Sequence, residues 1–360
     1  MLVRELLERV KFSIRGRRQA RVLLFSLVVI LLFSAWGCGR GNPGEKTTAS
    51  RLLMDTHVDL TLYGVDKKTS QQITKEVFAE MMRLENILSR TEAGSDLNSV
   101  NRAAGSDWVE VGPELYLVLG KALEFAELAE GAFDPTVAPL LELWGFGTEH
   151  PKRPSEDELQ AVLPLIDYRL VRLDRDRSAV FLPQEGMKLD LGAIAKGFII
   201  DQGLEKIRKL SSGAVLINAG GDIRLSGKKP SGEKWSVGIE DPLTKDRNSG
   251  EPCLAVLHLG GELGVATSGD YQRYFKEGGE LYHHILDPES GMPAGGLRSV
   301  TIVAKDALTA DALSTAVFVL GKERGLSLLE QLPGIEGVLV DEEGEVIYSS
   351  GLEGKIELMR

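Results

Sequence analysis

Cysteine is scarce in this sequence. Only Cys38 and Cys253 occur among 360 residues, so the fold cannot rest on a framework of disulfides. Cys253 follows a proline and precedes an apolar run, which favours a small hydrophobic side chain at the start of a strand. If Cys38 carries a lipid, as its surroundings indicate below, Cys253 has no partner within the chain.

Positive charge is also in short supply beyond residue 37. The remaining residues hold 35 Lys and Arg against 51 Asp and Glu, which gives a net charge of −16. Binding to nucleic acid needs a basic face, so that class of partner is disfavoured. A small molecule that carries phosphate is not excluded, particularly one that arrives with Mg²⁺.

Internal repeats and a second linker are missing as well. Residues 51–360 contain neither, so we expect them to form a single domain. A transport lipoprotein that captures its substrate between two similar lobes is therefore disfavoured, because no duplication is visible.

Residues 1–37 differ from the rest of the chain. Residues 1–21 carry seven Lys and Arg against two Glu, and the next 15 residues carry no charge. That uncharged run is shorter than the roughly 20 residues of a membrane-spanning helix. It ends in Ala35-Trp36-Gly37-Cys38, which resembles the lipidation motif of bacterial lipoproteins. The pattern predicts a lipoprotein-type signal peptide over residues 1–37.

We accordingly expect a lipid on Cys38 and a small, polar tether over residues 38–50. The alternative is an uncleaved anchor helix. Either arrangement places the domain in the cell envelope, on the periplasmic side of a membrane. The basic segment is long for a signal peptide, which points to a start codon downstream of Met1.

Predicted helices and strands are grouped rather than regularly alternating. Helical spacing and capping signals predict helices at 71–90 (capped by Thr69 or Ser70), 113–130, from Ser155, 193–210 and 307–320. Short β-like runs predict strands at 52–63, 169–173, 178–182, 187–191, 214–218, 234–239, 254–259 and 263–267, and a hairpin at 336–341 and 345–349. This grouping argues for an α+β fold.

An oxygen-rich pair lies in the helix predicted at 307–320. Asp311 and Thr315 are four residues apart, so they lie on one face. A carboxylate and a hydroxyl can hold a hard cation through oxygen. Taken alone, such a pair more often makes a hydrogen bond to itself or to solvent.

A junction of β-like run, glycine and helix lies nearby in the sequence. Asp190 ends an apolar run, Gly192 follows it, and Lys196 lies one turn into the predicted helix. The free N–H groups at a helix start suit phosphate, although an ordinary turn with a solvated lysine is the alternative. Two glycine-rich loops, residues 218–222 and 265–270, either approach a ligand closely or form tight hairpins.

Two further segments carry candidate site residues. His283 and His284 are adjacent, so in a strand they point to opposite faces and cannot both bind one metal. One imidazole can act as a general base or a ligand contact. The Phe133-Asp134 turn leads into an aromatic cluster, which suits the wall of a ring-binding pocket or a small separate core.

Eight short segments follow one another in a specific order. They are MDT at Met54–Thr56, GAFDPT, LWGFG, DLGAIAKG, NAGGD, VATSGDY, HHILDP and ADALST. Together they cover about residues 52–350 and resemble the ApbE family of FAD:protein FMN transferases. Many members read MGT where this chain reads Met54-Asp55-Thr56. The resemblance implies a T-fold-like α+β domain of mixed, mainly antiparallel sheets with packed helices.

The resemblance also implies roles for individual residues. Mg²⁺ would be held by the backbone carbonyl of Ala193 and the side chains of Asp311 and Thr315. FAD would contact Met54, Phe133, Asp134, Asp190, Lys196, His284 and Ile285. His284 is the candidate general base, and an Asp of the neighbouring loops, Asp270 or Asp287, is the next candidate.

The implied reaction is a Mg²⁺-dependent transfer of FMN from FAD to a protein hydroxyl, with release of AMP. The acceptor would be a Thr or Ser of a flavin-carrying redox subunit that resembles NqrC or RnfG. Two alternatives stay open: a Mg²⁺-dependent FAD pyrophosphatase that gives FMN and AMP, and a non-catalytic flavin-binding lipoprotein.

Overall fold

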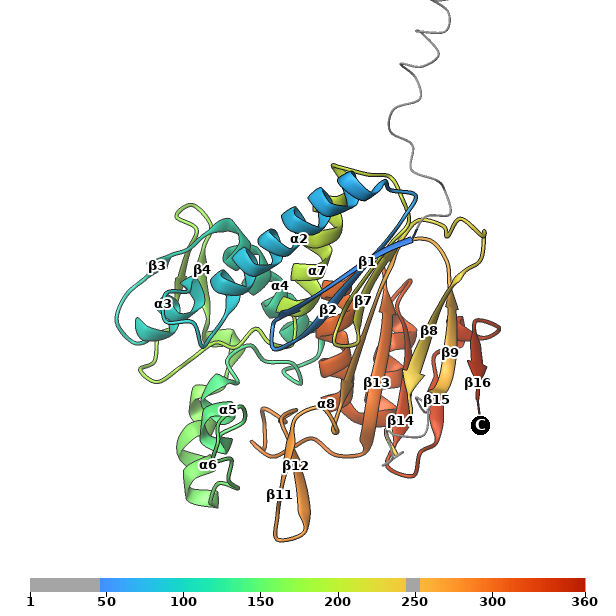
Figure 1. The fold of residues 1–360 in the computed structure, drawn as a ribbon. Coiled ribbons are helices and arrows are strands. Elements are labelled where there is room, and N and C mark those ends of the chain that lie inside the picture. The colour runs from blue at the N-terminus through green and yellow to red at the C-terminus, as the bar shows by residue number, and fades with distance from the viewer. Residues whose placement is uncertain (1–45, 244–252, 360) are drawn as a thin grey trace, which may run out of the picture.

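The computed structural model describes residues 46–243 and 253–359 (Figure 1). The predicted signal peptide, Cys38 and most of the predicted tether lie outside these residues. Within the described part of the chain, no helix is long and apolar enough to cross a membrane.

An antiparallel hairpin opens the domain. Strands β1 (Lys46–Leu53) and β2 (Thr56–Tyr63) pair along their whole length, and Met54 and Asp55 form the turn with φ values of 54° and 57°. The prediction of one strand over 52–63 was therefore wrong. The tether prediction also ran too far, because residues 46–50 belong to β1. This strand lies at the sheet edge and is mostly exposed, so its polar sequence resembles a linker.

The hairpin is part of an eight-stranded sheet in which every neighbouring pair is antiparallel. Its order is β1-β2-β6-β7-β10-β13-β14-β15. The later strands are β6 (Val215–Ala219), β7 (Asp222–Ser226), β10 (Leu263–Gly269), β13 (Leu297–Ala304), β14 (Glu336–Asp341) and β15 (Val346–Tyr348). The expectation of an α+β fold with mainly antiparallel sheets is confirmed.

Helices cover one face of this sheet (Figure 1). Those that pack on its strands are α2 (Lys67–Leu88), α7 (Ala195–Arg208) and α8 (Ala307–Gln331), and α4 (Pro113–Leu128) packs against α2 and α8. A three-stranded sheet covers the other face and comprises β8 (Trp235–Glu240), β9 (Cys253–Leu259) and β16 (Ile356–Leu358). Successive residues of β13 show the division, since Ile302 packs in the helical core and Val303 in the core against β8 and β9.

Smaller elements complete the domain. A small three-stranded sheet with its neighbouring helix comprises α3 (Asp96–Arg102), β3 (Val109–Glu110), β4 (Arg172–Asp174) and β5 (Ala179–Phe181). Another group comprises α5 (Ala138–Trp144), α6 (Glu156–Val162), β11 (Tyr274–Glu277) and β12 (Glu280–His283). Short 3₁₀ turns occur at η1 (Leu163–Leu165), η2 (Tyr168–Leu170) and η3 (Ser350–Leu352). The aromatic residues near Trp144 form a separate small core between α5 and the β11–β12 hairpin.

Several predicted elements differ from the structure. Helix α2 begins at Lys67 because the Asp66 side chain caps it, so Thr69 and Ser70 are not the cap. Residues 187–191 form no strand, and only Lys188 makes an isolated bridge to Val137. The run predicted at 169–173 is divided between η2 and β4. The capping box at Ser155 is confirmed at the start of α6.

Helices α7 and α8 cross in direct backbone contact. A Cβ atom on Gly197 would lie 2.2 Å from the carbonyl oxygen of Ala307, so this crossing requires glycine. Asp201 on α7 accepts hydrogen bonds from the Ala307 and Leu308 amides at 3.1 and 2.9 Å. The two contacts fix the start of α8 against α7, and therefore fix the predicted site residues of one helix relative to the other.

Candidate functional site

A cluster of three charged side chains, two buried carboxylates and a partly exposed lysine, lies where α7, α8 and β7 meet. Lys196 on α7 makes a short contact with Asp222, the first residue of β7, and its Nζ lies 3.6 Å from Oδ1 of Asp311 on α8. Both carboxylate side chains are only 4% exposed. We call these three residues the charged cluster. The structure thus brings the predicted Lys196 and Asp311 together and adds Asp222, which sequence reasoning left without a role.

Each member of the charged cluster changes the pKa of its neighbours. Burial raises the pKa of Asp311, and Asp222 adds to this effect while Lys196 opposes it. Burial by itself would lower the pKa of Lys196, but the two carboxylates raise it above the ordinary value. Lys196 therefore stays protonated at neutral pH and balances the negative charge that the cluster buries.

The predicted metal ligands lie around Asp311. The Gly197 amide lies in the first turn of α7, where backbone N–H groups have no partner within the helix, and it donates to Asp311 Oδ2 at 3.0 Å. This places the Asp311 carboxylate at the first turn of α7, which begins two residues after Ala193. One helical turn after Asp311, Thr315 Oγ1 lies 3.1 Å from Ser268 Oγ of β10.

This donor set suits Mg²⁺, which prefers oxygen ligands and commonly binds through one or two carboxylates together with substrate phosphates. Among the residues that the structure describes, no group of three or more His, Cys, Asp and Glu side chains is arranged to hold a metal. A site built from one Asp, one Thr and one backbone carbonyl does not need such a group. The residues present therefore fit the implied ion.

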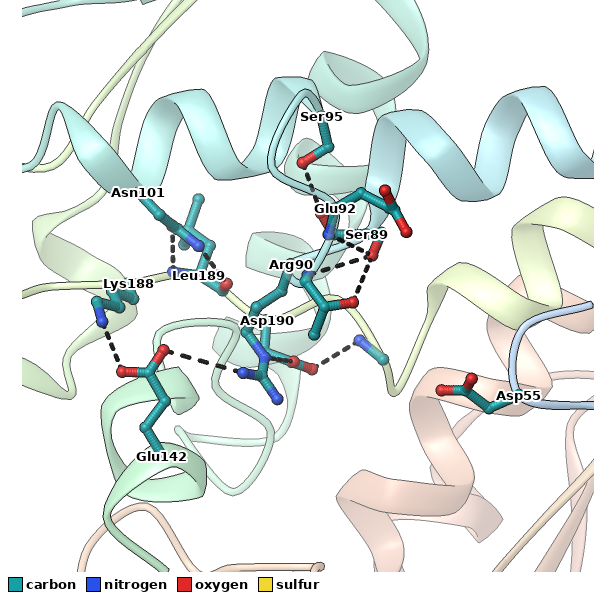
Figure 2. A network of polar contacts seen from close by, with 12 residues as sticks. Asp55, Ser89, Arg90, Glu92, Ser95, Asn101, Glu142, Lys188, Leu189 and Asp190 are labelled. Carbon is teal, nitrogen blue, oxygen red and sulfur yellow. Dashed lines mark hydrogen bonds and ion pairs between the residues drawn. The ribbon is translucent and has the colours of Figure 1, made fainter. Parts of the chain in front are cut away.

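A second set of contacts holds the backbone around Asp190 (Figure 2). The Asn101 side chain on α3 donates to the Leu189 carbonyl at 2.9 Å and accepts from the Leu189 amide at 2.7 Å. Asp190 Oδ2 accepts from Arg90 Nε at 2.7 Å, and its Oδ1 accepts from the Gly192 amide at 2.7 Å. We call residues 188–193 the Asp190 segment.

The carboxamide of Asn101 makes hydrogen bonds to both the carbonyl and the amide of Leu189, as a residue of a neighbouring strand would. This explains how an apolar run that reads as a strand is buried without joining a sheet. Both oxygens of Asp190 have partners in the structure, so its carboxylate shapes the turn that leads to Ala193. The predicted contact between Asp190 and FAD stays a prediction.

His284 follows the last residue of β12. Its Nδ1 lies 3.2 Å from the carbonyl oxygen of Arg273, which has no proton, so Nδ1 carries the proton and Nε2 has the free lone pair. Burial, and then the charge of Arg273, lower the pKa of His284 to about 4. A neutral imidazole with a free Nε2 can accept a proton at neutral pH.

The neighbouring residues have structural contacts. His283 is buried, with Nε2 2.9 Å from the Ala294 carbonyl and Nδ1 accepting from the Ile285 amide. The alternative bases are paired elsewhere, since Asp270 bonds to Arg298 and Asp287 accepts from the Ser290 hydroxyl.

The remaining predicted FAD contacts lie in or against the core. Phe133 and Ile285 are buried, while Met54 is partly buried and donates its amide to Glu85 at 2.7 Å. Asp134 Oδ1 accepts from both the amide and the hydroxyl of Thr136, and Oδ2 accepts from the Tyr168 amide. These bonds give the Asp134 carboxylate a role in the turn itself.

Sequence reasoning missed Asn101, Arg90, Asp222 and Arg273. The pairs Asn101–Leu189 and Arg90–Asp190 join residues 88 and 100 positions apart, and no local pattern reports such contacts. The position of Asp222 could have been predicted from the sequence. It follows two glycines after a β-like run, which is typical of the first residue after a tight turn between strands. Gly220 and Gly221 form the β6–β7 turn with positive φ, so Asp222 begins β7 beside the site.

A hollow elsewhere on the surface contains none of the predicted site residues. It is lined by residues of the α6 start and the β11–β12 hairpin, among them Arg153, Glu158 and Tyr282. The geometry of the charged cluster, rather than this hollow, therefore locates the candidate site.

The fold and the site define a T-fold-like α+β domain with two buried carboxylates and a lysine at the start of α7, a setting that suits a phosphate-bearing ligand. The sequence profile described as the ApbE family matches residues 54–339, and the chain belongs to this family. The FAD:protein FMN transferase of Treponema pallidum is 33% identical, over 92% of this chain and 95% of its own length. That of Klebsiella pneumoniae is 34% identical, over 84% and 91%.

Solved structures agree with this assignment. The crystal structure of the ApbE protein from Thermotoga maritima has a TM-score of 0.79 and 36% identity, and the match covers 86% of this chain and 99% of that one. The flavin transferase ApbE from Vibrio cholerae has a TM-score of 0.76 and 27% identity, with coverages of 87% and 100%.

Proposed function

We propose that the protein transfers FMN from FAD to a hydroxyl group of another protein and releases AMP. One observation carries the proposal: at the start of α7 the Asp311 carboxylate accepts the Gly197 amide and lies 3.6 Å from Lys196 Nζ, in a chain that belongs to the ApbE family. Relatives that align with most of this chain are named FAD:protein FMN transferase.

Asp311, Thr315 and the Ala193 carbonyl would hold Mg²⁺. When bound, this ion would neutralise negative charge on the diphosphate of FAD and on the departing AMP. Lys196 adds a fixed positive charge beside Asp311. The protein itself would mainly position the reactants, since phosphoryl transfer needs orientation and charge neutralisation more than covalent catalysis.

His284 is suited to remove the proton of the attacking hydroxyl at Nε2. The acceptor oxygen then forms a bond to the FMN phosphorus, and the bond from that phosphorus to the bridging oxygen breaks. AMP leaves with the bridging oxygen, and FMN stays on the acceptor through a phosphoester. Substitution of a general base costs about 10²–10⁴-fold in rate, so we expect a loss of that size for His284→Asn. His258→Asn, on an exposed residue of β9, is the control.

The test combines the protein, FAD, Mg²⁺ and an acceptor domain that resembles NqrC or RnfG. Covalent flavin fluorescence on the acceptor in a denaturing gel supports transfer. Free FMN and AMP without a labelled acceptor would support the pyrophosphatase alternative, and FAD binding without AMP release would support a non-catalytic flavin carrier.

The metal part of the proposal is tested in the same assay. Asp311→Ala removes the only formal charge among the proposed ligands, so it should lose most activity at limiting Mg²⁺. Thr315→Val should lose part of it, and Ala193→Ser should change little because the ligand there is backbone. Transfer at the native rate by Asp311→Ala under limiting Mg²⁺ would contradict the site.

The proposed setting is the cell envelope, with the domain tethered to a membrane by a lipid on Cys38 and facing the periplasm. The support is the basic segment, the short uncharged run and the terminal Cys of the N-terminal region. Cys38→Ser should abolish incorporation of labelled lipid. Unchanged incorporation in that variant would rule the anchor out.

A further inference from the structure

Arg273 has its backbone fixed beside His284. The carbonyl oxygen of Arg273 accepts the His284 amide at 3.1 Å and lies 3.2 Å from His284 Nδ1. A residue held in this way cannot move away from the candidate base without breaking both contacts. The position of its Cα is therefore set by the site.

The side chain of Arg273 is much less constrained. Its Nη2 lies 3.8 Å from Oδ2 of Asp55, and the two side chains are 59% and 90% exposed. An exposed pair at this distance contributes little, because water solvates both charges well. A guanidinium binds phosphate more strongly, since two parallel N–H groups match two phosphate oxygens.

The charge of Arg273 acts on the candidate site. After burial, it is the next cause of the lowered pKa of His284, and it offsets a small part of the rise that Asp222 and Asp311 cause in the pKa of Lys196. Arg273 and Lys196 thus supply two positive charges near one imidazole, in a chain whose residues beyond position 37 carry a net charge of −16. Such a concentration of positive charge favours an anionic ligand.

Asp55 lies in a tight turn, and its side chain is paired with Arg273. It belongs to the β1–β2 turn, where both central residues have positive φ, and the Met54 amide is bonded to Glu85. Figure 2 shows the Asp55 side chain pointing from this hairpin toward the segment that follows Asp190. The ion pair with Arg273 places the Asp55 carboxylate beside the guanidinium.

We propose that Arg273 binds the diphosphate of the substrate, and that Asp55 competes with this diphosphate for the guanidinium. Arg273 is then a specificity-determining residue for ligands with a nucleoside-diphosphate group, and Asp55 weakens their binding. The inference deepens the proposed function and rests on it for the identity of the substrate, but the recognition of a diphosphate can be measured on its own.

The experiment measures binding of ADP and of riboflavin to the folded domain by calorimetry, with and without Mg²⁺. Arg273→Gln should weaken ADP binding by about tenfold to a hundredfold, as expected when charge-assisted hydrogen bonds are lost. Arg273→Lys should recover part of the affinity, because it keeps the charge without the paired N–H groups. Riboflavin, which has no phosphate, should bind all variants equally.

Asp55→Asn should strengthen ADP binding by about twofold to fivefold, the range of an exposed ion pair. The double variant Asp55→Asn with Arg273→Gln should bind ADP with the affinity of Arg273→Gln. Asp55 is proposed to weaken ADP binding only by pairing with the Arg273 guanidinium, which this variant lacks. The matched control is Arg324→Gln, since Arg324 is 63% exposed and paired with Glu130 at 2.9 Å. This control should leave ADP binding unchanged.

Native ADP affinity in Arg273→Gln would overturn the inference, and so would an equal loss for ADP and riboflavin. The proposed function fails separately: a wild-type protein that labels no acceptor but binds ADP through Arg273 would keep this inference and lose FMN transfer. If the wild-type protein labels the acceptor but Arg273→Gln binds ADP with native affinity, FMN transfer is supported and the role of Arg273 is overturned.

Discussion

The charged cluster and the Asp190 segment flank the same start of α7, but they are held in different ways. The charged cluster takes Lys196, Asp222 and Asp311 from two helices and a strand, and its carboxylates are almost fully buried. The Asp190 segment has irregular backbone, and side chains from distant parts of the chain, chiefly Asn101 and Arg90, determine its path.

The difference shows two ways of positioning a site. Regular elements set the charged cluster, so its geometry depends on packing and on charge balance in a low-dielectric interior. Hydrogen bonds to backbone set the Asp190 segment, so its geometry depends on a few polar side chains. The charged cluster should tolerate small changes in side-chain shape, but removal of one charge should cost much of the free energy of unfolding. The Asp190 segment should lose a smaller part of that free energy with each hydrogen bond removed.

Lys196→Met should give the largest effect on stability. It leaves the buried Asp222 and Asp311 carboxylates without a cation, which should cost about 3 kcal/mol of the free energy of unfolding at pH 7. Urea denaturation followed by fluorescence measures this. Lys188→Met is the control, because Lys188 is 39% exposed and its partner Glu142 is 40% exposed. A loss below about 1 kcal/mol in Lys196→Met would show that the cluster is not held by charge balance.

Asn101→Ala tests the other side of the comparison. It leaves the buried amide and carbonyl of Leu189 without partners, so the free energy of unfolding should fall by about 2 kcal/mol. The matched control on the same helix is Asn98→Ala, because Asn98 bonds to the Glu92 carbonyl at an exposed position. Equal effects of the two substitutions in thermal and urea unfolding would contradict the role of Asn101.

The same contrast explains what the sequence could predict. Helical spacing predicted that Asp311 and Thr315 share one helix face, and α8 is a helix there. Their role as metal ligands is implied by the family resemblance and stays a prediction. Residues 187–191 were wrongly predicted as a strand, because an apolar run cannot report that Asn101 replaces the neighbouring strand. The β1–β2 turn was missed because Met54 and Asp55 adopt positive φ without glycine.

The role of Asp190 can be resolved by comparing Asp190→Asn with Arg90→Met. Each breaks the Arg90–Asp190 pair, whose side chains are 24% and 17% exposed, and each should cost about 1 kcal/mol of stability. If Asp190 acts only through the turn, both variants lose the same FAD affinity. If Asp190 also contacts FAD, as the resemblance implies, Asp190→Asn should lose clearly more, which fluorescence titration with FAD would detect.

The smallest expected effect concerns the pKa of His284. Its pKa in the folded protein, about 4, is below the ordinary value of 6.5. Between these values the unfolded chain binds the proton more readily, so His284 makes the folded state less stable as pH falls through this range and has no such effect at neutral pH. Arg273→Gln removes a nearby positive charge, so it should raise the pKa of His284, by about one unit at most.

An NMR titration of the His284 ring protons from pH 3 to 8 measures this shift directly, and His284→Asn identifies the signal. In Arg273→Gln the acid limb of the pH profile of FMN transfer should move to higher pH. A base with a higher pKa is protonated, and therefore inactive, at a higher pH. Stability at pH 7 should stay within about 0.5 kcal/mol of the native value, as expected for an exposed side chain. A shifted ring titration with an unmoved acid limb would assign the catalytic proton to a group other than His284.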